Sequence, residues 1–555
     1  MATALHALAL RAYQGGRHAE AADHCRALLR KSPDDLPALQ MLGAIAAAGG
    51  QLGEALDLAR RAAALAPDNP DTQGALGALL AQSGDAAGAL APLEHALARQ
   101  PRNAGLHNSR ADTLQRLGRF AEALAAYDRA LVAGPPHPEA LLQRGHVLLA
   151  LHKPAEALAS FGKSLAQRGD ARRIHCGQGL ALLALGRADD AAASFERVLA
   201  LAPKDANALN NLAVARHQQG RYDEAMALYE RLLAGAPDDS PARFGRAQLH
   251  LAHGRFPAGW DDHRWRQSAA EHRAALYQER LPGDLTGQTF WLRKDQGLGD
   301  EIFFLRFAPA LKRRGAHVIY QAGTKIAGLL RRPPVLGTAL DGVLDEAAPL
   351  PETARVLSVG DLPYALGPDS ETPPPLALQP DADQSAAIAA RLAALGPPPY
   401  IAVTWRAGTL ESNALYKAVP LAALAAAVAP LPGTLISVQR LPAAGEGAAF
   451  AAAAGRALHD LSDLNDDLEA MLALMARLDD YVAVSNTNVH LRASAGRPSR
   501  LLVPMPADWR WMAAGDESPW FPGSPIYRQA FGGSWDAALA RLSADLIAVF
   551  SLATL

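Results

Sequence analysis

The chain has little cysteine, no long uninterrupted apolar run and almost no net charge. Among 555 residues there are only Cys25 and Cys176, both within helical segments, which argues against a disulfide framework and indicates a reducing compartment. The formal net charge of −2 gives no reason to expect nucleic acid as a partner. Apolar stretches such as 421–431 are short and interrupted by proline, so we expect no membrane span.

Other absences narrow the class of protein further. No His-Glu-x-x-His or paired Cys-x-x-Cys spacing suggests a metal site, and no Walker-type loop supports phosphoryl transfer from ATP. Asp381 and Asp383 form an Asp-x-Asp string, but it falls in a proline-rich connection, where we interpret both as linker acids. Helix-forming residues follow Met1 directly, so we expect no signal sequence and a cytoplasmic protein.

The most informative feature is a period of 34 residues in the first part of the chain, in which the proline series has one gap, at Gly169. Three residue types share this frame. They are Pro33, Pro67, Pro101, Pro135, Pro203 and Pro237; Ala21, Ala55, Ala89, Ala123, Ala157, Ala191 and Ala225; and Gly16, Gly50, Gly84, Gly118, Gly186 and Gly220. Glycine allows the left-handed turn that ends a first helix, alanine lets two helices close together, and proline stops the second helix.

These units resemble tetratricopeptide repeats, and stacking seven of them predicts an α-solenoid with a continuous core. We assign the solenoid to residues 1–255, including a capping half repeat at 240–254, and a linker to 256–285. Such solenoids form a concave groove that binds an extended polypeptide. A related nucleocytoplasmic protein O-glycosyltransferase lines its groove with an asparagine ladder, whereas only Asn108, Asn210 and Asn211 lie near the corresponding turns here.

After the linker, short apolar strands alternate with helices, a pattern typical of parallel α/β structure. The expected strands are 289–292, 318–320, 401–404, 435–438, 481–484 and 500–503. This gives an N-terminal α/β lobe at 286–380, an interlobe connection at 381–399 and a C-terminal lobe at 400–555 with a closing helix. We expect that last helix, about 535–550, to brace the first lobe.

The first candidate site is the loop from Gln296 through Gly297 and Gly299 to Asp300, between a strand and a helix. Glycines let a backbone approach a ligand closely, and helix amides attract anions. The plain alternative is a turn in which Asp300 caps the helix. The string, with Arg306 downstream, resembles the first loop of heptosyltransferase-type enzymes of the two-lobed GT-B fold, and this resemblance implies that Asp300 is the catalytic base.

The second candidate includes Asn413, Tyr416 and Lys417, shortly after Arg406 at the end of a strand. The string Asn-x-Leu-Tyr-Lys resembles the segment that supplies the diphosphate-binding lysine of the nucleocytoplasmic O-glycosyltransferase. A fixed ammonium would stabilise the charge of a departing nucleoside diphosphate. A solvated loop lysine is the alternative, and we prefer the phosphate role for Lys417, with Arg406 assisting.

The third candidate is Asn486, Thr487, Asn488 and His490, which follow a strand and open a helix. That position in an open parallel sheet is where ligands bind, and the helix amides suit phosphate. The string resembles an Asp-Thr-x-x-x-His segment of heptosyltransferase-like proteins, with Asn486 in place of the aspartate. By itself, His490 is the kind of residue that packing or a backbone bond satisfies.

Aromatic residues concentrate further downstream, at Trp509, Trp511 and Trp520. They are able to stack on a base or a sugar, but tryptophan is more often a packing anchor, and we favour packing.

Together these resemblances, which include bacterial repeat-fused transferases that modify flagellins, imply two Rossmann-like lobes and a protein O-glycosyltransferase. It would transfer a hexosyl, N-acetylhexosaminyl or nonulosonic acid residue from a nucleotide sugar to Ser or Thr, with inversion and without a metal or cofactor. The acceptor would be a polypeptide in the groove, with flagellin as a candidate. A non-catalytic adaptor with a degenerate transferase domain is the alternative, and a lipopolysaccharide transferase is a third.

Overall fold

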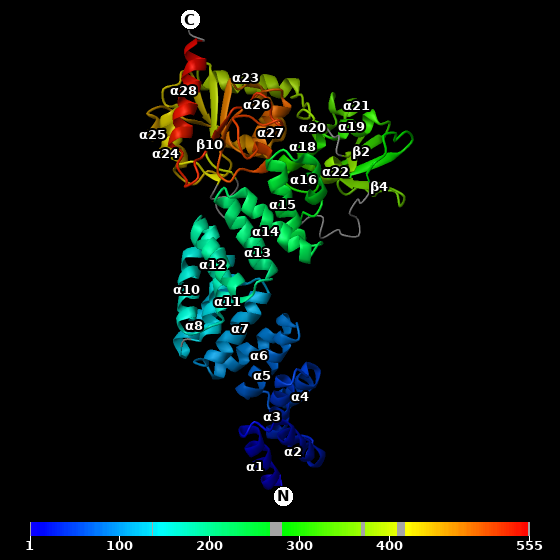
Figure 1. The fold of residues 1–555 in the computed structure, drawn as a ribbon, viewed down its shortest axis with the longest axis vertical. Helices are drawn as coiled ribbons and strands as arrows, with labels where there is room; N and C mark the ends of the chain where they lie inside the picture. The colour runs from blue at the N-terminus through cyan, green and yellow to red at the C-terminus, as the bar shows by residue number, and fades with distance from the viewer. Residues whose placement is uncertain (1, 136, 267–279, 368–371, 408–416, 553–555) are drawn as a thin grey trace. The chain divides into compact units, whose positions relative to one another are not determined.

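The computed structural model describes residues 2–135, 137–266, 280–367, 372–407 and 417–552 (Figure 1). The chain divides into two compact units, residues 1–208 and 209–555. The first unit is entirely helical in its described part, and the second contains the last helices of the repeat region and both β-sheets.

The first unit consists of paired antiparallel helices, in which each helix packs against the next one along the chain. Its helices are α1 (Ala2–Gln14), α2 (His18–Lys31), α3 (Leu36–Ala48), α4 (Leu52–Leu65), α5 (Pro70–Gln82), α6 (Ala86–Arg99), α7 (Ala104–Arg116), α8 (Phe120–Ala133), α9 (Pro138–Ala150), α10 (Pro154–Ala166), α11 (Ala171–Ala184) and α12 (Ala188–Leu201). The alanines in the 34-residue frame, from Ala21 to Ala225, are completely buried where the helices meet. The predicted helical solenoid is therefore confirmed.

The corner between the two helices of each pair adopts the left-handed backbone conformation. The framed glycines have φ values between 71° and 97°, and Gly254 continues the series at 73°. His152 occupies the same position in the pair α9–α10, with φ 56° and no glycine. The frame thus dictates the backbone conformation even where the sequence lacks the residue that favours it.

The second unit begins with α13 (Ala206–Gln218), which crosses the boundary, and continues with α14 (Tyr222–Gly235), α15 (Ser240–Ala252) and α16 (Phe256–His263). The helix α16 lies in the range assigned to a linker, so the expected half repeat is a full pair with a short second helix. Trp260, only 2% exposed, explains the difference, because its burial anchors α16 in the core of the second unit.

The first sheet is parallel, in the order β3-β2-β1-β4. Its strands are β1 (Thr289–Arg293), β2 (His317–Ala322), β3 (Gly342–Asp345) and β4 (Arg355–Ser358), and its helices are α18 (Leu298–Leu305), α19 (Ala308–Arg313), α20 (Thr324–Leu330), α21 (Val335–Thr338), η2 (Val359–Asp361) and α22 (Leu362–Leu366). The two expected strands are confirmed, while β3 and β4 were not anticipated.

The second sheet is also parallel, in the order β10-β9-β8-β5-β6-β7. Its elements are α23 (Ala382–Leu395), β5 (Tyr400–Thr404), α24 (Leu421–Val428), β6 (Thr434–Ser437), α25 (Glu446–Ala454), β7 (His459–Asp460), η4 (Ser462–Asp466), α26 (Leu468–Arg477), β8 (Asp480–Val484), α27 (Thr487–Ser494), β9 (Arg500–Val503), η5 (Trp509–Trp511), β10 (Ile526–Arg528) and α28 (Asp536–Leu552). All four expected strands are present.

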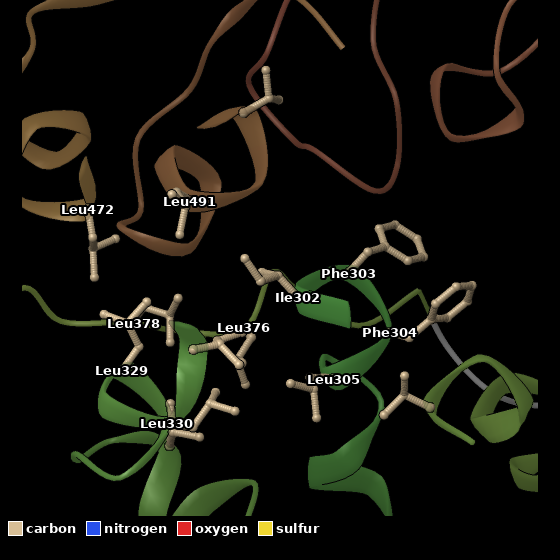
Figure 2. Packing of buried hydrophobic residues seen from close by; sticks show 14 of the residues in the cluster. Ile302, Phe303, Phe304, Leu305, Leu329, Leu330, Leu376, Leu378, Leu472 and Leu491 are labelled. Atoms are coloured by element: carbon tan, nitrogen blue, oxygen red, sulfur yellow. The ribbon is translucent and has the colours of Figure 1, made fainter. Parts of the chain in front are cut away.

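One apolar core joins the two sheet regions. Figure 2 shows Ile302 of α18 near Leu491 of α27, with Leu376 and Leu378, which precede α23, close by. The Leu378 amide donates to the Ser494 carbonyl over 2.9 Å, which ties this segment to the end of α27. The closing helix α28 packs against α24 and β10 of the second region, contrary to the expectation that it would brace the first, because its apolar face matches that region's own core.

Candidate functional site

The glycine loop connects the carboxyl end of β1 to the start of α18. Gln296 in this loop is half-buried, and Gly297 immediately precedes the helix without a side-chain cap. Asp300 therefore does not cap this helix, and its carboxylate is available for other partners. The arrangement presents the first turn of α18, including Gly299, to whatever lies beyond the end of the sheet.

A buried ionic network holds the base of this loop. Arg266, 1% exposed, donates from Nε to Asp295 Oδ2 over 2.5 Å and from Nη1 to Asp361 Oδ1 over 2.6 Å. Burial raises the pKa of Asp361 even though Arg266 opposes that shift. Because Asp295 directly precedes Gln296, the network fixes the backbone from which the glycine loop departs.

Asp300 forms an ion pair with Arg510, which follows β9 in the second sheet region. Arg510 also donates from Nη1 to both carboxylate oxygens of Asp508, over 3.1 and 3.2 Å. Burial alone lowers the pKa of Arg510, but Asp508 and Asp300 outweigh it and the net shift is upward. The two sheet regions thus contribute one carboxylate each to a single guanidinium.

His490 lies on α27 and reaches the backbone of α18. A Cβ atom placed on Gly299 would lie 3.3 Å from His490 Cδ2 and 3.6 Å from Thr487 Oγ1. Burial is the main cause that lowers the pKa of His490 well below its usual range, and Arg510 and Arg306 add to it. Its buried Nδ1 has no hydrogen-bond partner among the described residues. A neutral imidazole with unused hydrogen-bonding capacity therefore stands at the junction of the two helices.

Of the other residues in this motif, Asn486 and Asn488 have structural roles, whereas Thr487 lies at the candidate site. Asn486 caps α27, since its Oδ1 accepts from the Val489 amide over 3.2 Å and its Nδ2 donates to the Tyr481 hydroxyl over 3.1 Å. Asn488 is buried and donates to Asn465 Oδ1 over 3.2 Å. Asn486 and Asn488 hence position the helix, while the half-buried Thr487 remains at its open end beside Gly299.

Lys417 is half-buried beside the same cluster. Its carbonyl accepts from the Ala407 amide over 3.2 Å, which ties it to the end of β5. Its charge contributes to the lowered pKa of His490, after burial and the two arginines. It also helps Arg510 to lower the pKa of Asp508 against the effect of burial. Asn413 and Tyr416, from the same motif, lie outside the described residues.

Arg406 is engaged elsewhere. Its Nε donates to Glu446 Oε1 over 3.1 Å and its Nη2 to Glu446 Oε2 over 2.8 Å, a bidentate pair that also involves the Leu441 carbonyl. The side chain is 9% exposed. We expected Arg406 to assist in binding phosphate. In the structure its guanidinium instead pairs with the nearby carboxylate of Glu446.

The tryptophans are packing anchors, as expected. Trp509, Trp511 and Trp520 are 1–2% exposed and belong to the core. Arg306 lies in the same core, where it donates to the Trp520 carbonyl over 2.7 Å and stacks over Phe303 at 4.2 Å. Burial lowers the pKa of Arg306 to about 9.

The sequence did not single out Arg510 or Asp508, although both belong to the tryptophan-rich string. Their signal was the pairing of an acid with an arginine two residues later among aromatic residues. That pattern gave no indication that Arg510 also pairs with Asp300.

The assembled site combines two helix N-termini, a neutral histidine, a lysine and a carboxylate. Gly299 in the first turn of α18 lies close to Thr487 and His490 in the first turn of α27, and both helices follow the carboxyl ends of parallel strands. Positive helix ends and a nearby ammonium favour an anionic ligand. Asp300 adds a carboxylate that can accept a proton.

Two negative findings concern the described residues alone. They contain no group of three or more His, Cys, Asp or Glu side chains arranged to hold a metal ion. In the same part of the chain, every helix is either too short or too polar to cross a bilayer.

Comparison with known proteins adds one relative. The chain is 28% identical over 334 residues to protein FlbA of Caulobacter vibrioides (strain ATCC 19089 / CIP 103742 / CB 15), which covers 55% of this chain. The chain spans about half, 54%, of the length of FlbA.

Two solved structures of tetratricopeptide repeat proteins are similar to part of this chain. A tetratricopeptide repeat protein from Parabacteroides merdae ATCC 43184 is 23% identical, with a TM-score of 0.36, over 41% of this chain and 90% of its own. YrrB, a repeat protein with an unusual peptide-binding site, is 21% identical, with a TM-score of 0.31, over 33% of this chain and 95% of its own.

The family model described as tetratricopeptide repeat matches residues 6–70, 75–138, 142–206 and 176–240. These ranges coincide with the paired helices and with the 34-residue frame. The N-terminal helical part of the chain therefore consists of tetratricopeptide repeats.

Proposed function

We propose that the protein is an O-glycosyltransferase that transfers a sugar from a nucleotide donor to a Ser or Thr hydroxyl of a polypeptide. The observation that carries the proposal is the close approach of Gly299, which directly precedes Asp300 on α18, to His490 on α27, since both helices begin at the carboxyl ends of parallel strands. In this proposal residues 286–380 and 400–555 are the two lobes of a GT-B transferase, joined by 381–399.

The proposed chemistry is a single inverting displacement. The acceptor hydroxyl attacks the anomeric carbon, its proton passes to the Asp300 carboxylate, and the bond from the anomeric carbon to the leaving phosphate oxygen breaks. Negative charge that develops on the leaving group would be stabilised by Lys417, by a hydrogen bond from His490 and by the first turn of α27. Because these protein groups supply the stabilisation, the proposed reaction needs no metal.

The remaining site residues have supporting parts in this proposal. Gly297 and Gly299 allow the donor to approach the α18 backbone, with Gln296 and Thr487 at its rim. Arg406, through Glu446, would hold the carboxyl end of β5 beside Lys417, and Asn413 and Tyr416 would complete the donor site. The polypeptide acceptor would bind in the repeat groove, and flagellin is the acceptor we would test first.

An adaptor without catalytic turnover is the competing function, and Asn486 is the observation that favours it. The family pattern has an aspartate where Asn486 stands, so a carboxylate is absent from this helix end. The hydrogen bonds of Asn486 to Val489 and Tyr481 nevertheless keep α27 capped and its histidine in place. The site geometry thus survives the substitution, which favours the transferase.

Intact-mass spectrometry tests the proposal. Flagellin and other secreted proteins would be compared from cells with the wild-type gene, without it, and with Lys417→Ala, Asp300→Asn or Lys204→Ala. Lys204 lies exposed between α12 and α13 and serves as the control. We expect a repeated sugar-sized mass with the wild type and Lys204→Ala, and its loss in the other three strains. Unchanged masses in every strain would favour the adaptor.

A further inference from the structure

The short segment from Asp508 to Ala513 links the candidate site to the last repeat helices. It contains the 3-10 turn η5, whose start is capped by Asp508 through the Arg510 amide, over 3.0 Å. Arg510 projects from this turn toward Asp300, 210 residues earlier in the chain. This segment therefore supplies both Asp508 and the Arg510 guanidinium that joins Asp508 to Asp300.

The environment of Arg510 fixes its guanidinium closely. The group lies 4.4 Å from the centre of the Trp509 ring and 4.9 Å from that of Phe303, and the residue is 8% exposed. Its buried Nε has no hydrogen-bond partner in the described part of the chain. The position of Arg510 is thus set by its two carboxylates and by the aromatic faces, not by saturation of all its donors.

The last repeat pair supports this segment from the other side. The Ala513 amide donates to the Ala252 carbonyl at the end of α15 over 2.8 Å. Trp509 packs edge-on against Trp260 of α16, with ring centres 5.3 Å apart. Met512 lies between Trp509 and Ala513 in the sequence. Its φ is 59°, a backbone conformation that residues other than glycine rarely adopt. Such strain persists only where surrounding contacts determine the backbone.

We propose that Arg510 is a positioning residue that fixes the Asp300 carboxylate for catalysis, and that the repeat pair α15–α16 holds Arg510 in place through Trp260 and Ala252. This inference rests on the proposed transferase function. Besides binding the acceptor, the repeat region then supports the catalytic site through its final helices, α15 and α16. Arg510 itself exchanges no proton or bond with the substrates.

Steady-state kinetics of the full-length protein provide the first test. With Arg510→Met we expect kcat to fall by about 100-fold, because a displaced base misses its near-attack geometry. The KM for the nucleotide sugar should change by less than about threefold, since donor binding does not use this pair. Arg500→Met is the matched control, because it removes a similarly buried guanidinium from Asp480 in the same region without touching Asp300.

The decisive measurement is the double variant. If Arg510 acts through Asp300, Asp300→Asn together with Arg510→Met should have the same kcat as Asp300→Asn alone. Multiplication of the two single effects would overturn the proposal, because it would show that Arg510 acts on the reaction by another route. Equal losses with Arg510→Met and Arg500→Met would also overturn it, since they would indicate general destabilisation.

A readout without activity separates this inference from the proposed function. Urea unfolding would be measured for the wild type, Asp300→Asn, Arg510→Met and the double variant. These four proteins should show a coupling of about tenfold between Asp300 and Arg510 in the unfolding equilibrium constant. Coupling without any glycosyl transfer by the wild type would disprove the proposed function but would still support the pairing of Asp300 with Arg510. Transfer without coupling would sink the positioning role alone.

The contribution of the repeat pair is tested by Ala513→Pro, which removes the amide that donates to Ala252. We expect the kinetic pattern of Arg510→Met, with a reduced kcat, a donor KM within about threefold and no further loss when combined with Asp300→Asn. Wild-type kcat in a folded Ala513→Pro protein would show that α15 does not support the site.

Discussion

The imidazole of His490 lies against the backbone of Gly299, so that a Cβ atom at residue 299 would lie 3.3 Å from its Cδ2 and 3.5 Å from its Nε2. Helices that follow strands of two separate parallel sheets therefore meet at a position where even one methyl group alters the fit. The glycine is needed here for close approach of two helices, since its backbone conformation does not require one.

Substitution of Gly299 by alanine should lower kcat by about tenfold, because the added methyl group pushes His490 and Thr487 away by a few tenths of an ångström. Gly447→Ala in α25 is the control, because no atom lies within 4 Å of its new Cβ. Initial-rate measurements with both variants check this, and equal rates for the two would contradict the close-approach argument.

Acidification should destabilise the second unit through His217. Burial, followed by the charge of His253, lowers the pKa of His217 to about 4, whereas an unfolded histidine titrates near 6.5. Between these values the unfolded state binds a proton that the folded state does not, so stability is full above pH 6.5 and falls as pH drops toward 4. The slope is at most about 1.4 kcal/mol per pH unit from this residue.

Urea unfolding at a series of pH values measures that slope. His217→Gln should flatten it across the window from pH 6.5 to 4, while His18→Gln at the exposed start of α2 should leave it unchanged. An identical slope in wild type and His217→Gln would show that other groups dominate the acid response.

Packing inside the repeats should depend on Gly177 of α11. A Cβ atom there would lie 2.6 Å from Phe161 Cζ of α10, so Gly177→Ala should destabilise the protein by about 1–3 kcal/mol despite the better helix propensity of alanine. Gly162→Ala, next to Phe161 but with no atom within 4 Å of the new methyl group, should stabilise by about 0.5–1 kcal/mol. Circular dichroism during urea unfolding distinguishes the two signs.

The network beneath the glycine loop should be sensitive to loss of Arg266. Arg266→Met removes the guanidinium that pairs with both buried carboxylates, Asp295 and Asp361, and should cost about 3–5 kcal/mol of stability. Arg264→Met, two residues earlier, removes a contact over the Tyr364 ring at 4.7 Å and should cost about 1 kcal/mol or less. Equal midpoints of chemical unfolding for these variants would contradict the assigned role of Arg266.

The sequence predicted those parts of the structure that depend on local periodicity. The 34-residue frame located the helix pairs, and short apolar runs located β1, β2, β5, β6, β8 and β9. It missed the strands β3, β4, β7 and β10 and the helix α16, whose segments carry weaker patterns. The left-handed conformation of His152 follows only from comparison with the neighbouring repeats, in which glycine occupies the same position, because histidine itself does not favour it.

For the candidate site, the sequence predicted Asp300, Lys417 and His490 from motifs that follow strands β1, β5 and β8. The tertiary structure decided their partners. Arg510 contacts Asp300 across 210 residues, and Arg406 pairs with Glu446 across 40. Periodicity and motifs report local backbone preference and burial, whereas an ion pair between distant residues depends on where the whole topology brings their backbones together. Sequence alone therefore determined the repeats and the candidate groups, and the fold decided which groups meet.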